Sequence, residues 1–137
     1  MPAHTKSRTI ALLIDGPGTE ASVGDGKVYW PVPADLNGYS LTDARASCVE
    51  SGLGGALEVM VENIKFDDLR VAPTAPSKVP MLTANLSLAA GAINAIGSVV
   101  SNGDQVVSTG HRLRIKVITL NGAVPGPKGL MITLTFN

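Results

Sequence analysis

The sequence predicts an all-β protein, an antiparallel β-sandwich of about eight short strands that is jelly-roll-like. Apolar and polar residues alternate nearly throughout the chain, which is the periodicity of strands with one buried face. Turn-forming segments rich in Gly and Asn, such as 51–55 and 101–104, separate the alternating runs. A Pro-rich stretch at 71–80 has the composition of an extended loop that crosses between two sheets.

The expected strands follow the alternating runs in chain order. They are predicted at 10–14, 28–32, 41–48, 57–61, 82–88, 113–117 and 130–136, with a weaker eighth strand at 105–107. The segment 88–97 fits either a short helical turn or a loop, because it is rich in Ala but interrupted by Gly91.

Two of these strands carry further local signals. Pro31 and Pro33 lack the N–H that a central strand must donate, so they place the 28–32 strand at the edge of a sheet. From Ala44 to Cys48 the small residues alternate out of phase with Leu41. That change of phase predicts a β-bulge near the start of the third strand.

The chain has the size of one domain, with a flexible polar arm at 1–9 and a single sandwich at 10–137. Lys plus Arg equals Asp plus Glu at 11 each, so no net charge attracts the protein to nucleic acid or to an anionic membrane. Charged residues are only 16% of the chain, and the mean hydropathy is +0.24. So few charges predict that neutral surface is buried against other subunits.

Cysteine content and the N-terminus suggest a soluble protein made in the cytosol. Cys48 is the only cysteine, which excludes an intrachain disulfide and a Cys-based metal cluster. The apolar run at 10–14 is far shorter than the core of a signal peptide, and no stretch approaches the length of a membrane span.

The run "NGAVPGPKG" at 121–129 admits three interpretations: a phosphate loop, a collagen-like repeat, or a connection between strands. In a phosphate loop counted from Gly122, Pro127 would replace the second glycine and Gly129 the hydroxyl residue. A collagen repeat would need glycine at every third position over many triplets. Because period-two alternation follows at once, a strand-connecting loop is the preferred interpretation.

No set of residues predicts catalysis, a metal site or a cofactor. His4 falls in the arm and His111 at the start of a strand, and no nucleophile-elbow motif accompanies either. Asp67 and Asp68 are adjacent carboxylates without the spacing of a calcium loop. The expectation is therefore a protein that is not an enzyme, although any two carboxylates could still meet in space as a glycosidase pair.

Two groups of residues are candidates for contact with a partner. Arg112, Arg114 and Lys116 share one face of a strand and could receive an acidic surface. The alternative is a solvated outer face, balanced across the sheet by Glu58 and Glu62.

Tyr29 and Trp30 lie on opposite faces of their strand, so whichever points outward could stack on a sugar ring. The commoner place for such an aromatic side chain is the core.

The order of segments resembles a group of small bacteriophage virion proteins with jelly-roll heads. Those proteins have an apolar first strand, Gly-Lys-x-Tyr and a Pro-containing strand, LNGxxL, and a Gly-rich turn. An alternating strand ending in Asn, a Met-Leu strand, an Asp-containing turn, a Leu-x-Ile-x-Val strand and a closing Gly-Leu-x-[VI]-x-Leu-x-Phe strand follow. The corresponding phrases here are "IALLIDGPG", "GKVYWPVP", "LNGYSL", "SGLGG", "LEVMVEN", "MLTANLSL", "SNGD", "RLRIKV" and "GLMITLTF". The resemblance covers 10–137 and departs from the group at the Pro-rich loop and at Gly110-His111.

This resemblance implies a structural protein of the virion that is made in the host cytoplasm and forms homo-oligomers, typically trimers. A capsid decoration (cement) protein that binds the major capsid protein and bridges its subunits is the first expectation. The arm would then hook onto the capsid, with Lys6 and Arg8 among the contact residues. The alternative is a receptor- or glycan-binding head module of the tail or baseplate. Neither role involves a cofactor, nucleic acid or a membrane.

Overall fold

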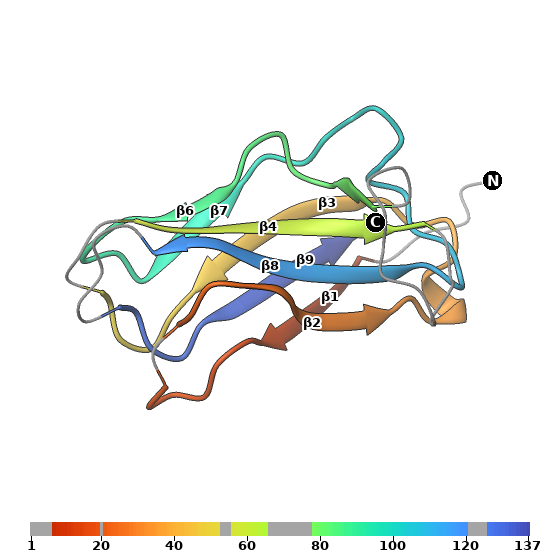
Figure 1. Cartoon of the computed structure of the whole chain (residues 1–137). Helices are drawn as coiled ribbons and strands as arrows, with labels where there is room; N and C mark the ends of the chain where they lie inside the picture. The colour runs from red at the N-terminus through yellow and green to blue at the C-terminus, as the bar shows by residue number, and fades with distance from the viewer. Residues whose placement is uncertain (1–6, 20, 53–55, 66–77, 121–125) are drawn as a thin grey trace.

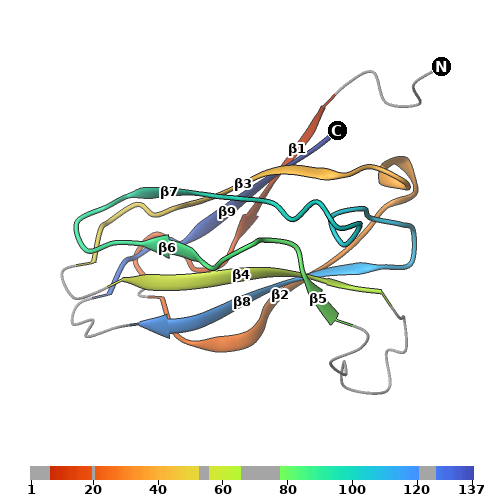
Figure 2. The ribbon, with the colours of Figure 1, turned by 90° about the horizontal axis from the view of Figure 1, so that it is seen from above.

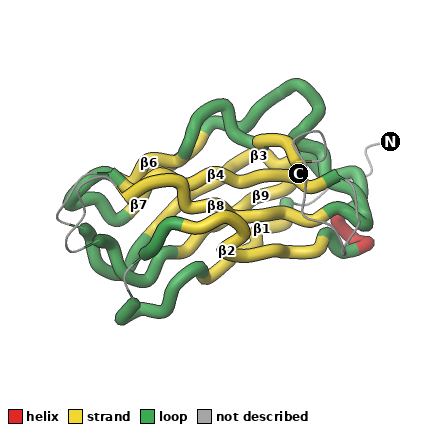
Figure 3. The backbone as a smooth tube through the Cα atoms, in the orientation of Figure 1, coloured by secondary structure: helices red, strands yellow, loops and turns green. Residues whose placement is uncertain are grey.

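The computed structural model is a sandwich of two antiparallel β-sheets (Figure 1). It describes residues 7–19, 21–52, 56–65, 78–120 and 126–137. The strands are β1 (Arg8–Leu13), β2 (Gly24–Pro31), β3 (Leu41–Ser47), β4 (Leu57–Ile64), β5 (Lys78–Pro80), β6 (Leu86–Leu88), β7 (Asn94–Gly97), β8 (Arg112–Leu120) and β9 (Met131–Phe136). One 3-10 turn, η1 (Ala34–Leu36), is the helical element of the described residues (Figure 3). The expected all-β antiparallel sandwich is confirmed.

The strands are divided between a four-stranded and a five-stranded sheet, which lie one above the other in Figure 2. The first sheet has the order β1-β9-β3-β7. The second has the order β2-β8-β4-β5, and β6 also pairs with β4. Most connections therefore cross from one sheet to the other, and the last strand, β9, lies between β1 and β3.

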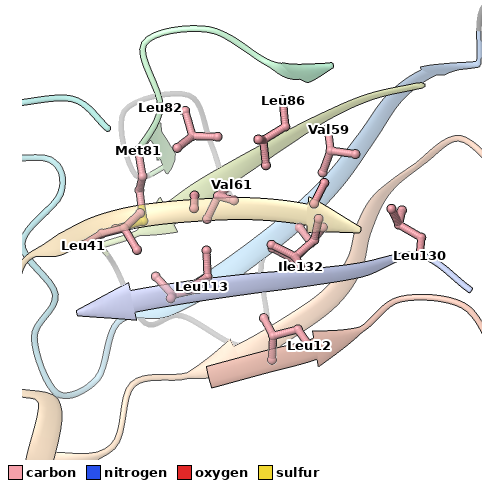
Figure 4. Packing of buried hydrophobic residues seen from close by; sticks show 14 of the residues in the cluster. Leu12, Leu41, Val59, Val61, Met81, Leu82, Leu86, Leu113, Leu130 and Ile132 are labelled. Carbon is pink, nitrogen blue, oxygen red and sulfur yellow. The ribbon is translucent and has the colours of Figure 1, made fainter. Parts of the chain in front are cut away.

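The core fills the space between the two sheets and consists of the apolar residues of each alternating strand (Figure 4). The inward residues of β4, β8 and β9 are essentially inaccessible to solvent: Val59, Val61, Leu113, Ile115, Val117, Ile132, Leu134 and Phe136. Burying one such side chain contributes roughly 1.5–3 kcal/mol. The apolar residues of each alternating strand thus form the packing that holds the two sheets together.

Both local signals in the early strands are confirmed. Among the described strands β2 pairs only with β8 and is an edge strand, so the missing N–H of Pro31 interrupts no central ladder. The register between β3 and β9 shifts between Leu41 and Asp43, which is the predicted bulge. β2 also begins earlier than expected, at Gly24, with a second register shift before Val28.

The predicted strand at 82–88 is wrong in its first half. Only Leu86–Leu88 forms a strand, β6, whereas Leu82 pairs with Val99 in an isolated bridge. The Thr83 N–H donates to the Ser98 carbonyl at 2.8 Å. β5 forms at 78–80, inside the stretch expected to be loop, and the rest of that stretch lies outside the described residues.

The prediction of a short helical turn or a loop at 88–97 holds for 89–93, which is turn and loop, but is wrong for Asn94–Gly97, which forms β7. This strand exists through its pairing with β3, from Ala44↔Gly97 to Ser47↔Asn94. A Cβ added at Gly97 would lie 3.0 Å from Leu86 Cδ2, so the glycine permits close packing against β6.

The weak strand predicted at 105–107 is not formed. Val106 makes one bridge, to Ser40, while Val107 is fully buried. Asn63 Nδ2 donates to the carbonyl of Val106 at 3.1 Å and the Leu41 N–H donates to that of Gln105 at 2.9 Å. These bonds from two sheets tie the segment across one end of the sandwich.

The N-terminal strand starts at Arg8, two residues before the predicted boundary. Arg8 pairs with Phe136 and Thr9 with Thr135, so both belong to the sheet and not to an arm of 1–9. The arm residues 1–6, which include His4 and Lys6, lie outside the described part of the chain.

The later half of the 121–129 run lies against the loop that follows β3, and 121–125 lies outside the described residues. Lys128 forms a bridge with Glu50, and Gly129 leads into β9. Gly129 has a φ of +71°, and a Cβ there would lie 2.7 Å from Val49 Cγ2 and 3.2 Å from Pro17 Cα. Only glycine satisfies both the backbone conformation and the space.

We expect Gly129→Ala to lower the free energy of unfolding by about 2 kcal/mol or more, since left-handed backbone costs an L-residue roughly 1–2 kcal/mol before any clash. Gly110→Ala is the matched control, because Gly110 also has a positive φ but nothing lies within 4 Å of its added Cβ. Urea unfolding monitored by circular dichroism measures both variants. Equal losses would show that the contact with Val49 and Pro17 is unimportant.

Candidate interaction surface

The predicted basic residues lie on the outer surface of the five-stranded sheet. Because Leu113 and Ile115 point into the core, the residues between and beside them on β8 point outward. The register places Tyr29, Arg114 and Glu62 side by side on β2, β8 and β4. We call the surface formed by Tyr29, Glu58, Glu62, Arg112, Arg114 and Lys116 the charged face.

Arg114 is a structural residue at the centre of the charged face. Its Nε and Nη2 atoms donate to Glu62 Oε1 at 2.8 Å and 2.5 Å. The exposed fractions are 3% for Arg114 and 9% for Glu62. The charge of Arg114 is therefore not accessible to a partner. Glu62 neutralises it, which agrees with the second interpretation of the basic residues, a face balanced across the sheet.

The pKa of Arg114 reflects two opposing effects. Burial alone lowers it, because a buried cation loses hydration, but hydrogen bonds to Tyr29 and Glu62 and their attraction raise it. The net pKa lies above the ordinary arginine value. The cation is thus firmly kept charged and paired within the sheet.

Tyr29 is the outward aromatic of β2. Its exposed fraction is 43%, and Arg112 Cζ lies 5.8 Å from the centre of its ring. A cation over an aromatic ring at this separation contributes roughly 0.5–1 kcal/mol at an exposed site. The pair presents an aromatic edge beside a guanidinium at the rim of the charged face.

Trp30 is on the opposite side of the strand and packs against the core. Its ring stacks on that of Phe136, with centroids 6.4 Å apart and an interplanar angle of 20°. The two aromatic residues therefore do lie on opposite faces, as the alternation predicted. Tyr29 remains the candidate for a ligand contact, and Trp30 does not.

The remaining members of the charged face are half-buried. Lys116 faces Met60 across the β4–β8 ladder, and Glu58 Oε1 accepts a hydrogen bond from Asn85 Nδ2 at 3.1 Å. The three predicted cations are thus on one face, as expected, but they differ in environment. Arg112 and Lys116 reach solvent, whereas Arg114 does not.

Arg8 lies away from the charged face, at the start of β1. Its Nη1 forms a 3.0 Å ion pair with Asp35 Oδ2 of the η1 turn, and both side chains are about half exposed. An exposed pair of this kind contributes less than about 1 kcal/mol, so it does not prevent Arg8 from meeting a partner.

His111, the histidine considered for catalysis, is half-buried before β8. Its pKa is lowered by burial and by the positive charge of Lys65, and its Nδ1 has no hydrogen-bond partner among the residues that the structure describes. Asp67 and Asp68 lie outside the described residues. Within the described ranges, no group of three His, Cys, Asp or Glu residues could hold a metal ion, and no helix is long and apolar enough to cross a membrane.

The structure also has a nearly neutral surface that was not singled out from the sequence. It is the outer side of the four-stranded sheet, formed by the outward residues of β1, β9, β3 and β7, and we call it the neutral face. Its residues are Thr9, Ala11, Leu13, Met131, Thr133, Thr135, Asp43, Arg45, Ser47, Asn94 and Ile96. Its two charges pair with each other, Arg45 Nε to Asp43 Oδ2 at 2.8 Å. Leu13 and Ile96 are 54% and 67% exposed.

The outward residues of β9, Thr133 and Thr135, were visible in the sequence as the polar half of an alternating run. What the sequence lacked was the strand order, which brings these threonines beside β1 and β3. Thr9 and Thr135 form a hydroxyl–hydroxyl hydrogen bond of 3.1 Å across that boundary.

No protein-family model matches this chain, and no curated protein matches it either.

We expect Glu62→Gln to lower the free energy of unfolding by about 3 kcal/mol, because it leaves the buried Arg114 cation without its countercharge at almost unchanged side-chain volume. The matched control is Asp43→Asn, which breaks the exposed pair with Arg45 and costs less than about 1 kcal/mol. Thermal and urea unfolding of both variants provide the measurement. A loss for Glu62→Gln no larger than that of the control would contradict a structural role for the buried pair.

Proposed function

We propose that this protein is a structural protein of a bacteriophage virion, a decoration protein that binds the major capsid protein and stabilises the head by bridging its subunits. The order of sequence phrases over 10–137 carries the proposal, because it is the feature shared with virion proteins of this kind. The confirmed all-β sandwich is the architecture that such proteins require.

We further propose that the sandwich is a jelly roll. The strand order supports this, because one sheet contains β1, β9, β3 and β7 and the other β2, β8, β4 and β5. Taking β5 and β6 as two halves of one strand beside β4 gives the eight strands of two interlocked Greek keys.

The surfaces suit a protein held in place by many weak contacts. On the neutral face, Asp43 and Arg45 form an ion pair with each other. At the centre of the charged face, Glu62 and Arg114 neutralise each other. Such surfaces lose little hydration energy when covered by another neutral protein surface. Repeated on a symmetric lattice, modest contacts add up to a large stabilisation of the shell, and for the same reason we propose that copies of this chain also contact each other.

The arm is the proposed hook onto the capsid. A variant that lacks residues 1–6 keeps β1 and the Arg8–Asp35 pair, so its fold and thermal stability should be unchanged. It should lose at least about tenfold in affinity for capsids stripped of this protein, since the arm contributes to every bridging contact. Co-sedimentation with purified capsids measures the binding, and undiminished binding would contradict the arm mechanism.

A second function, recognition of a glycan by a tail or baseplate module, is favoured by one observation. Tyr29 is a half-exposed outward aromatic ring with the Arg112 guanidinium over one of its faces, so its other face could stack on a sugar while the guanidinium donates to the sugar's hydroxyl groups.

If this second function is correct, the protein should bind defined sugars on a glycan array, and Tyr29→Ala should weaken that binding about tenfold or more. Lys27→Ala, elsewhere on β2, is the control. Binding that is absent, or that is equal for the two variants, would rule out the Tyr29 surface.

A further inference from the structure

Among the described strands, β1 pairs with β9 on one side and leaves its other backbone edge without a neighbouring strand. The Ile14 N–H donates to the Leu130 carbonyl, so the even-numbered residues of β1 direct their backbone groups toward β9. On β9, the odd-numbered residues direct their backbone groups toward β3, as the two hydrogen bonds between Asn137 and Ser40 show. The N–H and C=O groups of Thr9, Ala11 and Leu13 therefore point away from the sheet.

The other edge strands carry features that discourage pairing with another chain. β2 has Pro31 and a register shift between Gly24 and Val28. β5 is three residues long and ends in Pro80, and β6 is three residues long as well. β7 has only four residues, the last of them Gly97. Proline, irregular register and short length are the usual means by which natural sheets protect their edges.

β1 has none of these protective features. It is six residues long, it pairs with β9 without a register shift, and it contains no proline or glycine. Between Arg8 and Asp15 the chain bears no charge. The side chains of Thr9, Ala11 and Leu13 are all exposed, and no other strand of the described residues pairs with this edge.

We propose that β1 pairs in antiparallel fashion with β1 of a second copy of this chain, about a two-fold axis at Ala11. In a two-fold antiparallel pair one residue faces itself across the axis, and an outward-directed residue such as Ala11 does so with two backbone hydrogen bonds. Centring on Ala11 also places Thr9 opposite Leu13 of the second copy, so all three outward-directed residues are used. Each of these facing pairs exchanges two backbone hydrogen bonds.

The side chains agree with this register. Ile10 faces Leu12 of the second copy on the inner side, and Ala11 faces Ala11 on the outer side without crowding. At each end, Arg8 faces Ile14 of the second copy, so no like charges are brought opposite each other. The two neutral faces then become continuous across the axis, because β1 forms one border of that face.

A second copy is the occupant that this edge selects, because the strand is uncharged between Arg8 and Asp15 and is complementary to itself in shape and backbone hydrogen bonding. The contact does not depend on the proposed role in the virion. It associates two chains, and it differs from the trimer implied by the resemblance.

Light scattering after size exclusion should give about twice the chain mass of 14.1 kDa at micromolar concentration. Ala11→Lys should raise the dissociation constant roughly tenfold or more, because it places like charges directly opposite each other at the axis. Ala11→Asp should do the same, and an equal mixture of the two variants should associate again. Ile96→Lys, at another exposed position but on the far edge strand β7, should leave the pair intact.

Folding of each variant is checked by circular dichroism, since Ala11 is exposed and its backbone groups do not bond to β9. Hydrogen exchange gives an independent readout, because the Thr9, Ala11 and Leu13 amides should be protected only in the associated protein. The Ile10 and Leu12 amides should be protected in both states.

A monomer at all concentrations, or a trimer, would overturn the proposal. So would an Ala11→Lys variant that associates as well as the parent, a mixture of the charged variants that stays monomeric, or association only with a different protein.

Discussion

The whole architecture depends on where the C-terminal strand lies. β9 is inserted between β1 and β3, so the four-stranded sheet cannot form until the last residues of the chain have found the first. Leu130, Ile132, Leu134 and Phe136 are fully buried, which makes β9 the apolar centre of that layer. The mutual hydrogen bonds between Ser40 and Asn137 continue this pairing to the final residue. Such long-range pairing loses loop-closure entropy before its stabilising contacts form, and for this reason sandwiches of this kind typically fold slowly.

With the sheets closed in this way, the polar residues are left to the two outer faces, which differ in character. On the five-stranded sheet, the two central charges, Arg114 and Glu62, are buried and neutralise each other. On the four-stranded sheet, threonines and exposed aliphatic residues form a surface with one exposed ion pair. Neither face concentrates unbalanced charge, which suits association with protein surfaces better than attraction of a polyanion.

Much of this fold was predictable because the decisive signal is periodic. β4, β8 and β9 are long alternating strands, and their inward residues were identified correctly from the alternation alone. The edge position of β2 followed from Pro31, and the bulge in β3 from a change of phase after Leu41. β5 and β7 were missed, because three or four residues are too few to show a period and their strand conformation comes from their neighbours.

The candidate surface was predictable only in part. Alternation placed Arg112, Arg114 and Lys116 on one face, but their burial depends on which acidic residue the register brings opposite them. Tyr29 and Trp30 were assigned to opposite faces, whereas the choice of the inward ring depends on Phe136, far away in the sequence. The free edge of β1 was not visible at all, because it is defined by the strand order of the whole sheet.

The most direct test of the account as a whole is the number of copies of this protein in purified virions relative to the major capsid protein, measured by quantitative mass spectrometry. The account predicts a number comparable to that of the capsid protein, because only the shell offers so many equivalent sites. A few copies per particle would contradict the decoration role and point to the tail or baseplate. Absence from the particle would contradict a structural role in the virion altogether.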